Sequence, residues 1–259
     1  MTETRRARFT VAYDGGAFHG FAKNRDVETV AGSLERVLSL VTRTDVEVTG
    51  AGRTDAGVHA WGQVVGVDLP ARTDLIDVTR RVNKMCAPAL AVRLAEWAPT
   101  PDFSARFDAL WRHYRYTILN TETPNPFLAG TAWHVSQPLD LHLMQLACAP
   151  FIGEHDFSSF CRRPKVDDGP EGDTPPSMVR RVLAAEWSDL GDGRIRLDIR
   201  GTAFCHQQVR SITGTLVEVG LGKRTAGEMM GILRARDRNC AGQVAPPHGL
   251  CLWEVGYPR

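Results

Sequence analysis

The order of strand and helix patterns along the chain constrains its fold more than any other feature. In the first part, Phe9, Val11 and Tyr13 alternate with polar neighbours as in a strand, and later apolar residues recur at helical spacing. The patterns cover, in order, residues 7–13, 30–41, 46–49, 63–69, 74–85 and 90–97. They predict the series strand, helix, strand, strand, helix, strand.

The second part of the chain repeats this order. Its patterns cover residues 110–120, 140–149, 179–189, 194–200, 209–219 and 250–255. Asp140 is expected to cap the first helix, and Gly191-Asp192-Gly193 is typical of a hairpin turn. Thr225 and Glu228 have the spacing of a capping box that opens an additional helix.

Two copies of this order predict an α+β fold made of two ferredoxin-like halves. We expect an N-terminal half over residues 1–105 and a C-terminal half over 106–259, with a surface insertion near 162–176. The two sheets are expected to join into a continuous antiparallel sheet with helices on one side and a central cleft. Fold alone does not indicate function.

Composition excludes several classes of protein. The six cysteines are scattered without a Cys-x-x-Cys pair, and the histidines have no metal-binding spacing, so we expect no metal and no cofactor. No apolar run reaches the length of a membrane span, and the first residues lack the apolar stretch of a signal peptide, so a soluble cytoplasmic protein is expected. A net charge of +1 does not by itself indicate nucleic-acid binding.

The segment Gly50-Ala-Gly-Arg-Thr-Asp-Ala-Gly-Val-His-Ala60 stands between two predicted strands. Its glycines allow the backbone to approach a ligand closely, and Arg53 and Asp55 are two residues apart. Taken alone, this pattern also fits a tight turn with a surface ion pair of little energetic weight.

The string Gly52-Arg-Thr-Asp-Ala-Gly-Val-His59 resembles the signature of the tRNA pseudouridine synthase A family. Other segments agree with this family in the same order along nearly the whole chain. They are Tyr13-Asp14-Gly15, Phe103-Ser-Ala-Arg-Phe107, Arg112-His-Tyr-Arg-Tyr116, Gly153-Glu-His-Asp-Phe157, Val209-Arg210 and Gly249-Leu-Cys-Leu252.

The resemblance implies an isomerase that converts uridine to pseudouridine without metal, redox partner or cofactor. The family's invariant aspartate falls on Asp55, and the arginine that pairs with it falls on Arg210. Tyr114 matches the tyrosine that stacks on the target uracil, Leu252 a hydrophobic wall of the pocket, and Arg53 an arginine that enters the RNA. From the residues alone, Tyr114 and Leu252 also fit an ordinary core, and Arg210 fits a solvated helix face.

The resemblance further implies tRNA as the partner, with uridines 38, 39 and 40 of the anticodon stem and loop as substrates, and a homodimer. The chain departs from the family at Phe21-Ala22, where tryptophan and glutamine are usual, and at Gln208, where methionine is more typical. The main alternative is a catalytically inactive tRNA-binding or RNA-folding protein on the same scaffold. A second alternative is a metal-dependent phosphohydrolase built on Glu154-His155-Asp156, but the sequence shows no further acidic or histidine ligands in recognisable spacing. His155 and Asp156 are instead expected to cap or brace the turn after the preceding helix.

Overall fold

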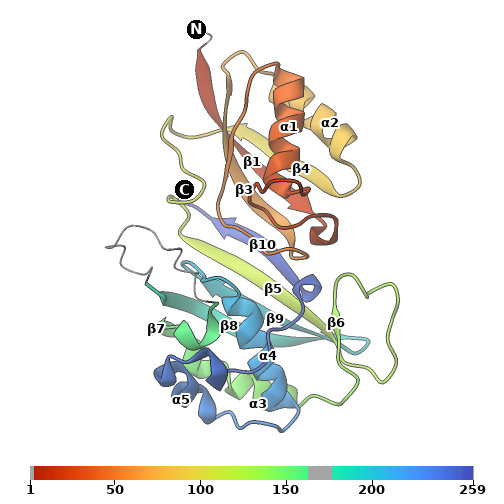
Figure 1. The fold of residues 1–259 in the computed structure, drawn as a ribbon, viewed down its shortest axis with the longest axis vertical. Coiled ribbons are helices and arrows are strands. Elements are labelled where there is room, and N and C mark those ends of the chain that lie inside the picture. Colours follow the sequence, from red (N-terminus) through yellow and green to blue (C-terminus); the bar gives the residue numbers. More distant parts are fainter. Residues whose placement is uncertain (1–2, 163–176, 259) are drawn as a thin grey trace. The chain divides into compact units, whose positions relative to one another are not determined.

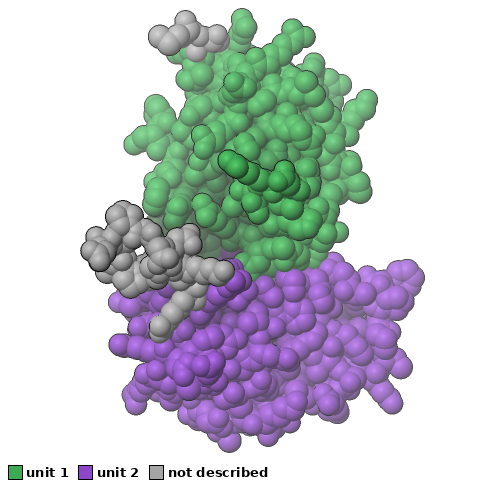
Figure 2. Space-filling view, in the orientation of Figure 1, with its two compact units in different colours: residues 1–113, 250–259 green, residues 114–249 purple. Residues whose placement is uncertain are grey.

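The computed structural model describes residues 3–162 and 177–258, so the predicted insertion at 162–176 lies almost wholly outside the described residues. The chain forms two compact units, which are coloured separately in Figure 2. Unit 1 comprises residues 1–113 and 250–259, and unit 2 comprises residues 114–249. Within the described residues, no helix is long and apolar enough to cross a membrane.

Unit 1 contains a sheet with two helices, α1 and α2, on the same face (Figure 1). Its elements are β1 (Thr4–Tyr13), a 3₁₀ turn (Gly15–Ala17), α1 (Val30–Thr42), β2 (Val48–Gly50), β3 (His59–Pro70), α2 (Leu75–Cys86), β4 (Leu90–Trp97) and β10 (Leu250–Gly256). The strand order is β4-β1-β3-β10, and β2 also pairs with β3. Phe9 and Val11 of β1 are fully buried, as their alternation predicted.

Unit 2 contains a sheet in the order β5-β9-β8-β7, with β6 paired to β5 (Figure 1). Its strands are β5 (Trp111–Leu119, which begins in unit 1), β6 (Trp133–His134), β7 (Gly153–Asp156), β8 (Val179–Gly191) and β9 (Arg194–Gly201). Its helices are α3 (Leu141–Leu146), α4 (Gln208–Gly220) and α5 (Glu228–Ala235). Short 3₁₀ turns cover Ala149–Phe151, Ser158–Phe160, Arg238–Cys240 and Pro247–Gly249.

The α+β class is confirmed, and one detail of the pairing differs from the prediction. Most pairs are antiparallel, but β10 runs parallel to β3 and β6 runs parallel to β5. The sheet pairing is therefore mixed, and the expectation of a wholly antiparallel sheet is wrong.

Local signals in the sequence account for most element boundaries. Asp140 caps α3 by accepting a hydrogen bond from the Leu143 amide, as predicted. This helix ends at Leu146, earlier than expected, where the Cys148 amide donates to the Gln145 carbonyl in a 3₁₀-type hydrogen bond at 3.1 Å. The predicted hairpin turn is present, with Asp192 at φ 51° between two glycines that also have positive φ.

The expected capping box at Thr225 forms in part. The Glu228 carboxylate accepts hydrogen bonds from both the Thr225 amide (2.8 Å) and the Thr225 hydroxyl (3.0 Å). The Glu228 amide, however, donates to the Thr225 carbonyl at 3.2 Å and not to its side chain. Helix α5 consequently begins at Glu228.

Candidate active site

The loop between β2 and β3 carries Asp55. Asp55 is half-buried, Arg53 before it is exposed, and Thr54 between them is buried. The Val58 amide donates to the Asp55 carbonyl at 3.1 Å, and Gly57 adopts φ 78°, a left-handed conformation that glycine accommodates without strain. The loop is therefore a tight turn with the aspartate near its start.

Thr54 is held on two sides immediately before Asp55. Its hydroxyl and that of Tyr13 are 2.8 Å apart in a buried hydrogen bond. Its carbonyl accepts from the Phe21 amide at 3.0 Å. Since Asp55 follows directly, these two contacts fix the backbone from which the Asp55 side chain projects.

Two glycines allow neighbouring backbone to press against this loop. A Cβ on Gly15 would lie 2.2 Å from the Val58 carbonyl oxygen, so only glycine fits there. Gly20 adopts φ 98°, and a Cβ there would lie 3.1 Å from the Thr54 carbonyl oxygen. The chain after β1 and the loop before β3 are thus in direct backbone contact.

The segment Tyr13-Asp14-Gly15 braces the loop as a unit. Tyr13 contacts Thr54, and Gly15 packs on Val58. The ring Nδ1 of His59 lies 3.0 Å from the Gly15 amide, which donates to it, and 3.1 Å from the Asp14 carboxylate. Sequence reasoning identified this segment only through the family resemblance and assigned it no role.

The departure at Phe21 affects packing beside the loop. The Phe21 side chain is buried, and a Cβ on Gly50 would lie 2.4 Å from its ring. The ring therefore lies directly against the backbone at the end of β2. A phenylalanine in place of the usual tryptophan still covers this part of the loop.

Two long side chains anchor the start of the loop from the sheet. Arg112 Nη2 donates to the Ala51 carbonyl at 2.8 Å and to the Arg106 carbonyl at 2.7 Å. Gln63 Nε2 donates to the Gly52 carbonyl at 2.7 Å. Neither role could be read from the sequence, because no local pattern indicates which carbonyls these side chains reach.

Leu252 lies in the strand next to the one that leaves the Asp55 loop. In the parallel pairing of β10 with β3, Leu252 is the partner of Ala60. The Leu252 side chain is fully buried. Unit 1 thus holds three of the five predicted site residues, namely Arg53, Asp55 and Leu252.

Tyr114 and Arg210 belong to unit 2. Tyr114, in β5, is buried and meets Phe204 edge to face, with ring centroids 5.3 Å apart. Arg210, in the first turn of α4, donates from Nε to the Ala245 carbonyl at 2.8 Å. Burial raises the pKa of the neighbouring Tyr116 phenol, and the positive charge of Arg210 acts in the opposite direction.

Comparisons with known proteins agree on a single family. A sequence model described as tRNA pseudouridine synthase matches residues 10–108 and 147–258. The chain belongs to the tRNA pseudouridine synthase family. The family membership that the sequence of the Asp55 loop indicated is therefore confirmed. The activity of this family is an isomerisation.

Individual members of the tRNA pseudouridine synthase family match this chain along its whole length. A tRNA pseudouridine synthase A from Brevibacillus brevis is 41% identical over 254 residues, covering 98% of this chain and 100% of that protein. The proteins of the same name from Caulobacter sp. and Bacillus subtilis are 38% and 36% identical, each covering 97% of this chain and 98% and 99% of their own. A solved Cbf5-Nop10-Gar1 complex aligns at a TM-score of only 0.37 and 14% identity, over 96% of this chain and 49% of its own, too distant to inform the fold.

The segment Glu154-His155-Asp156 makes structural contacts with neighbouring residues. It forms β7, where His155 Nε2 lies 3.1 Å from the Ile152 carbonyl and Asp156 accepts from the Ser158 amide at 2.9 Å. The His155 contact braces the turn before the strand, as predicted, whereas the Asp156 contact braces the turn that follows it. Among the described residues, no group of three His, Cys, Asp or Glu side chains could hold a metal ion.

Proposed function

We propose that this chain converts uridine to pseudouridine in the anticodon stem and loop of tRNA, at positions 38, 39 and 40, with Asp55 as its catalytic carboxylate. The observation that carries the proposal is the Asp55 loop, which has the family signature and is held in place on both sides of the aspartate. A reaction that depends on one carboxylate needs such a fixed backbone. The proposed setting is the cytoplasm.

The reaction breaks the bond between uracil N1 and ribose C1′ and forms a bond from C5 to C1′. The proton on C5 is lost and N1 gains one, so no atom is added or removed overall. Asp55, as a carboxylate, either attacks the ribose or withdraws a ribose proton so that the base departs. Both routes require the ionised carboxylate. We propose Arg210 as the residue that pairs with Asp55.

For the other residues we propose the roles that the family resemblance implies. Arg53 is exposed beside Asp55, which suits a side chain that enters the RNA and offsets part of the few kcal/mol needed to flip a nucleotide. Tyr114 supplies an aromatic face for the uracil. We propose Leu252, in the strand beside the loop, as the hydrophobic wall of the uracil pocket.

We also propose that the chain is built from two ferredoxin-like halves whose sheets join around a central cleft. The order β4-β1-β3, with β2 on β3 and all pairs antiparallel, supports this for the first half. The boundary near residue 105 and the homodimer stay predictions. Because arginine side chains are expected to contact tRNA phosphates, the affinity for tRNA is expected to fall steeply as the salt concentration rises.

The proposal is tested with unmodified tRNA transcripts that each keep a single uridine at position 38, 39 or 40. Native protein is expected to form pseudouridine at these positions and to leave uridines elsewhere in the tRNA unchanged. If the protein binds the transcripts but forms no pseudouridine, the catalytic proposal fails, and a tRNA-binding or RNA-folding role on the same scaffold replaces it.

A further inference from the structure

One segment of unit 2 lies along helix α4 and contacts the Arg210 side chain. We call residues 241–246 the strap. Its Ala245 is fully buried, its amide donates to the Arg210 carbonyl at 3.1 Å, and its carbonyl accepts from Arg210 Nε at 2.8 Å. The orientation of the Arg210 guanidinium therefore depends on where the strap places Ala245.

The strap runs antiparallel to α4 over one row of helix positions. Arg210, Gly214 and Glu218 are spaced by four residues, so they lie on the same face of the helix. A Cβ on Gly214 would lie 1.8 Å from the Gln243 carbonyl oxygen, so the glycine permits direct contact between helix and strap. Glu218 accepts from the Gln243 amide at 3.2 Å.

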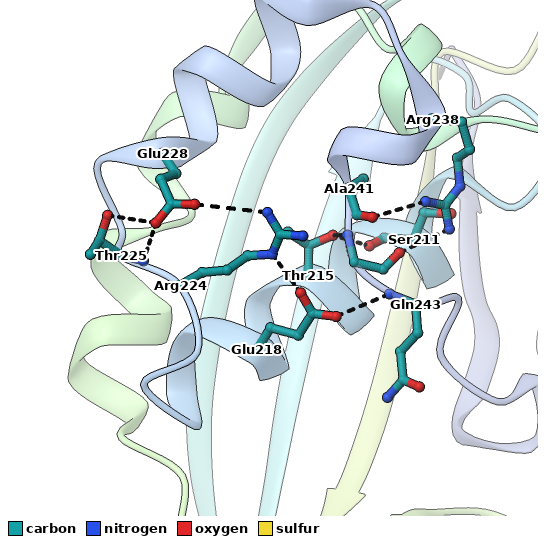
Figure 3. A network of polar contacts seen from close by, with 10 residues as sticks. Ser211, Thr215, Glu218, Arg224, Thr225, Glu228, Arg238, Ala241 and Gln243 are labelled. Atoms are coloured by element: carbon teal, nitrogen blue, oxygen red, sulfur yellow. Dashed lines mark hydrogen bonds and ion pairs between the residues drawn. The ribbon is translucent and has the colours of Figure 1, made fainter.

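Further contacts secure the end of the strap that is distant from Arg210. The Thr215 hydroxyl accepts from the Gly242 amide at 2.9 Å. Arg238 donates to the carbonyls of Ala241 (3.3 Å) and Gly242 (2.9 Å). Figure 3 shows these groups around the strap.

Glu218 connects the strap to a second arginine. Its other carboxylate oxygen accepts from Arg224 Nε at 2.5 Å, and Arg224 Nη1 lies 3.8 Å from Glu228 (Figure 3). The Glu218 side chain is 21% exposed, so this charge-assisted contact is partly shielded from water. The carboxylate is thus fixed by Arg224 on one side and holds the Gln243 amide on the other.

We propose that Glu218 is a positioning residue for Arg210, acting through the strap. This inference rests on the proposed function, in which Arg210 pairs with the catalytic carboxylate. A guanidinium is planar, so a hydrogen bond from Nε to a fixed carbonyl restricts the directions in which its terminal nitrogens can point. When Glu218 is lost, the strap loosens, Ala245 shifts, and the guanidinium no longer keeps its direction.

The test compares Glu218→Ala with Glu228→Ala in pseudouridine formation on tRNA. Both variants remove a carboxylate next to Arg224, but only Glu218 contacts the strap, so Glu228→Ala is the matched control. Glu218→Ala is expected to lower kcat by about tenfold to a hundredfold, because small displacements of a catalytic group are that costly, with KM for tRNA within about twofold. Glu218→Gln keeps an acceptor for the Gln243 amide and is expected to restore most of the loss.

Three results would overturn the inference. They are a kcat for Glu218→Ala equal to that of Glu228→Ala, a loss that falls on KM alone, or no recovery in Glu218→Gln. If Glu218→Ala does not fold, Thr215→Val takes its place, since it removes the acceptor for Gly242 without changing side-chain shape. Native protein and Asp55→Asn are measured alongside. An inactive native protein refutes the proposed function, whereas an active one with an unaffected Glu218→Ala refutes only the role of Glu218.

Discussion

Replacing Tyr13 by phenylalanine tests how the Asp55 loop is held. Tyr13 and Thr54 are 5% and 7% exposed, and their hydroxyls are 2.8 Å apart. Tyr13→Phe leaves the buried Thr54 hydroxyl without this partner, which costs about 1–3 kcal/mol of unfolding free energy. For a chain of this size, that corresponds to a fall in melting temperature of roughly 2–12 °C.

The double variant Tyr13→Phe/Thr54→Val separates loss of the hydrogen bond from loss of packing. Valine has nearly the shape of threonine, so the double variant has no orphaned hydroxyl at Thr54. It is expected to be more stable than Tyr13→Phe alone, with a coupling free energy of about 0.5–3 kcal/mol from a double-mutant cycle in urea. Because Asp55 follows Thr54, Tyr13→Phe is also expected to lower kcat by up to about a hundredfold.

Two results would refute this reasoning. The first is a Tyr13→Phe protein with native stability, which would mean that the hydroxyl pair contributes nothing. The second is a double variant whose loss equals the sum of the two single losses, which would mean that the two side chains act independently. Urea midpoints and steady-state kinetics on the same preparations distinguish these cases.

Three other predictions follow from close contacts, thiol chemistry and charge. Gly15→Ala places a Cβ against the Val58 carbonyl and is expected to lower the free energy of unfolding by at least about 1–3 kcal/mol. Gly231 lies in α5 with open space around it, so Gly231→Ala is expected to raise the free energy of unfolding by about 0.4–1 kcal/mol. Thermal melts of both variants check these values. A hydrogen bond with Cys161 lowers the pKa of the Cys205 thiol, while the pKa of the Cys161 thiol is raised. Iodoacetamide is therefore expected to label Cys205 before Cys161, at a rate that falls as the pH is lowered through the Cys205 pKa. Faster labelling of Cys161, measured by peptide mass spectrometry, would contradict this. The logarithm of the tRNA association constant is expected to fall linearly with the logarithm of the salt concentration. An association constant that does not change with salt would exclude phosphate contacts as the main source of affinity.

Local signals allowed much of the fold to be predicted from the sequence. The caps at Asp140 and the hairpin at Asp192 involve residues within a few positions of each other, so turn and helix rules identify them. Strand β7 was missed because its four residues lack alternating polarity. The parallel pairing of β10 with β3 could not be predicted either, because no local pattern in the sequence marks which strand the last one joins.

The candidate site residues come from the family resemblance, whereas the contacts that hold the Asp55 loop could not be predicted from the sequence. Family resemblance pointed to Asp55, whereas the contacts from Tyr13 to Thr54 and from Gly15 to Val58 join residues more than forty positions apart. Such contacts depend on the folded chain, and no periodicity reports them. Gly214 did offer a signal, since a glycine inside a helix costs about 1 kcal/mol relative to alanine and its presence indicates close packing.

The most direct test of the central claim is pseudouridine formation by Asp55→Asn, compared with Asp192→Asn. Asp192 is the control because its side chain is 92% exposed in the hairpin turn, and asparagine also tolerates its positive φ. Asp55→Asn is expected to bind tRNA with native affinity and form no pseudouridine, while Asp192→Asn retains native activity. If Asp55→Asn converts anticodon-arm uridines at the native rate, Asp55 is not the catalytic carboxylate.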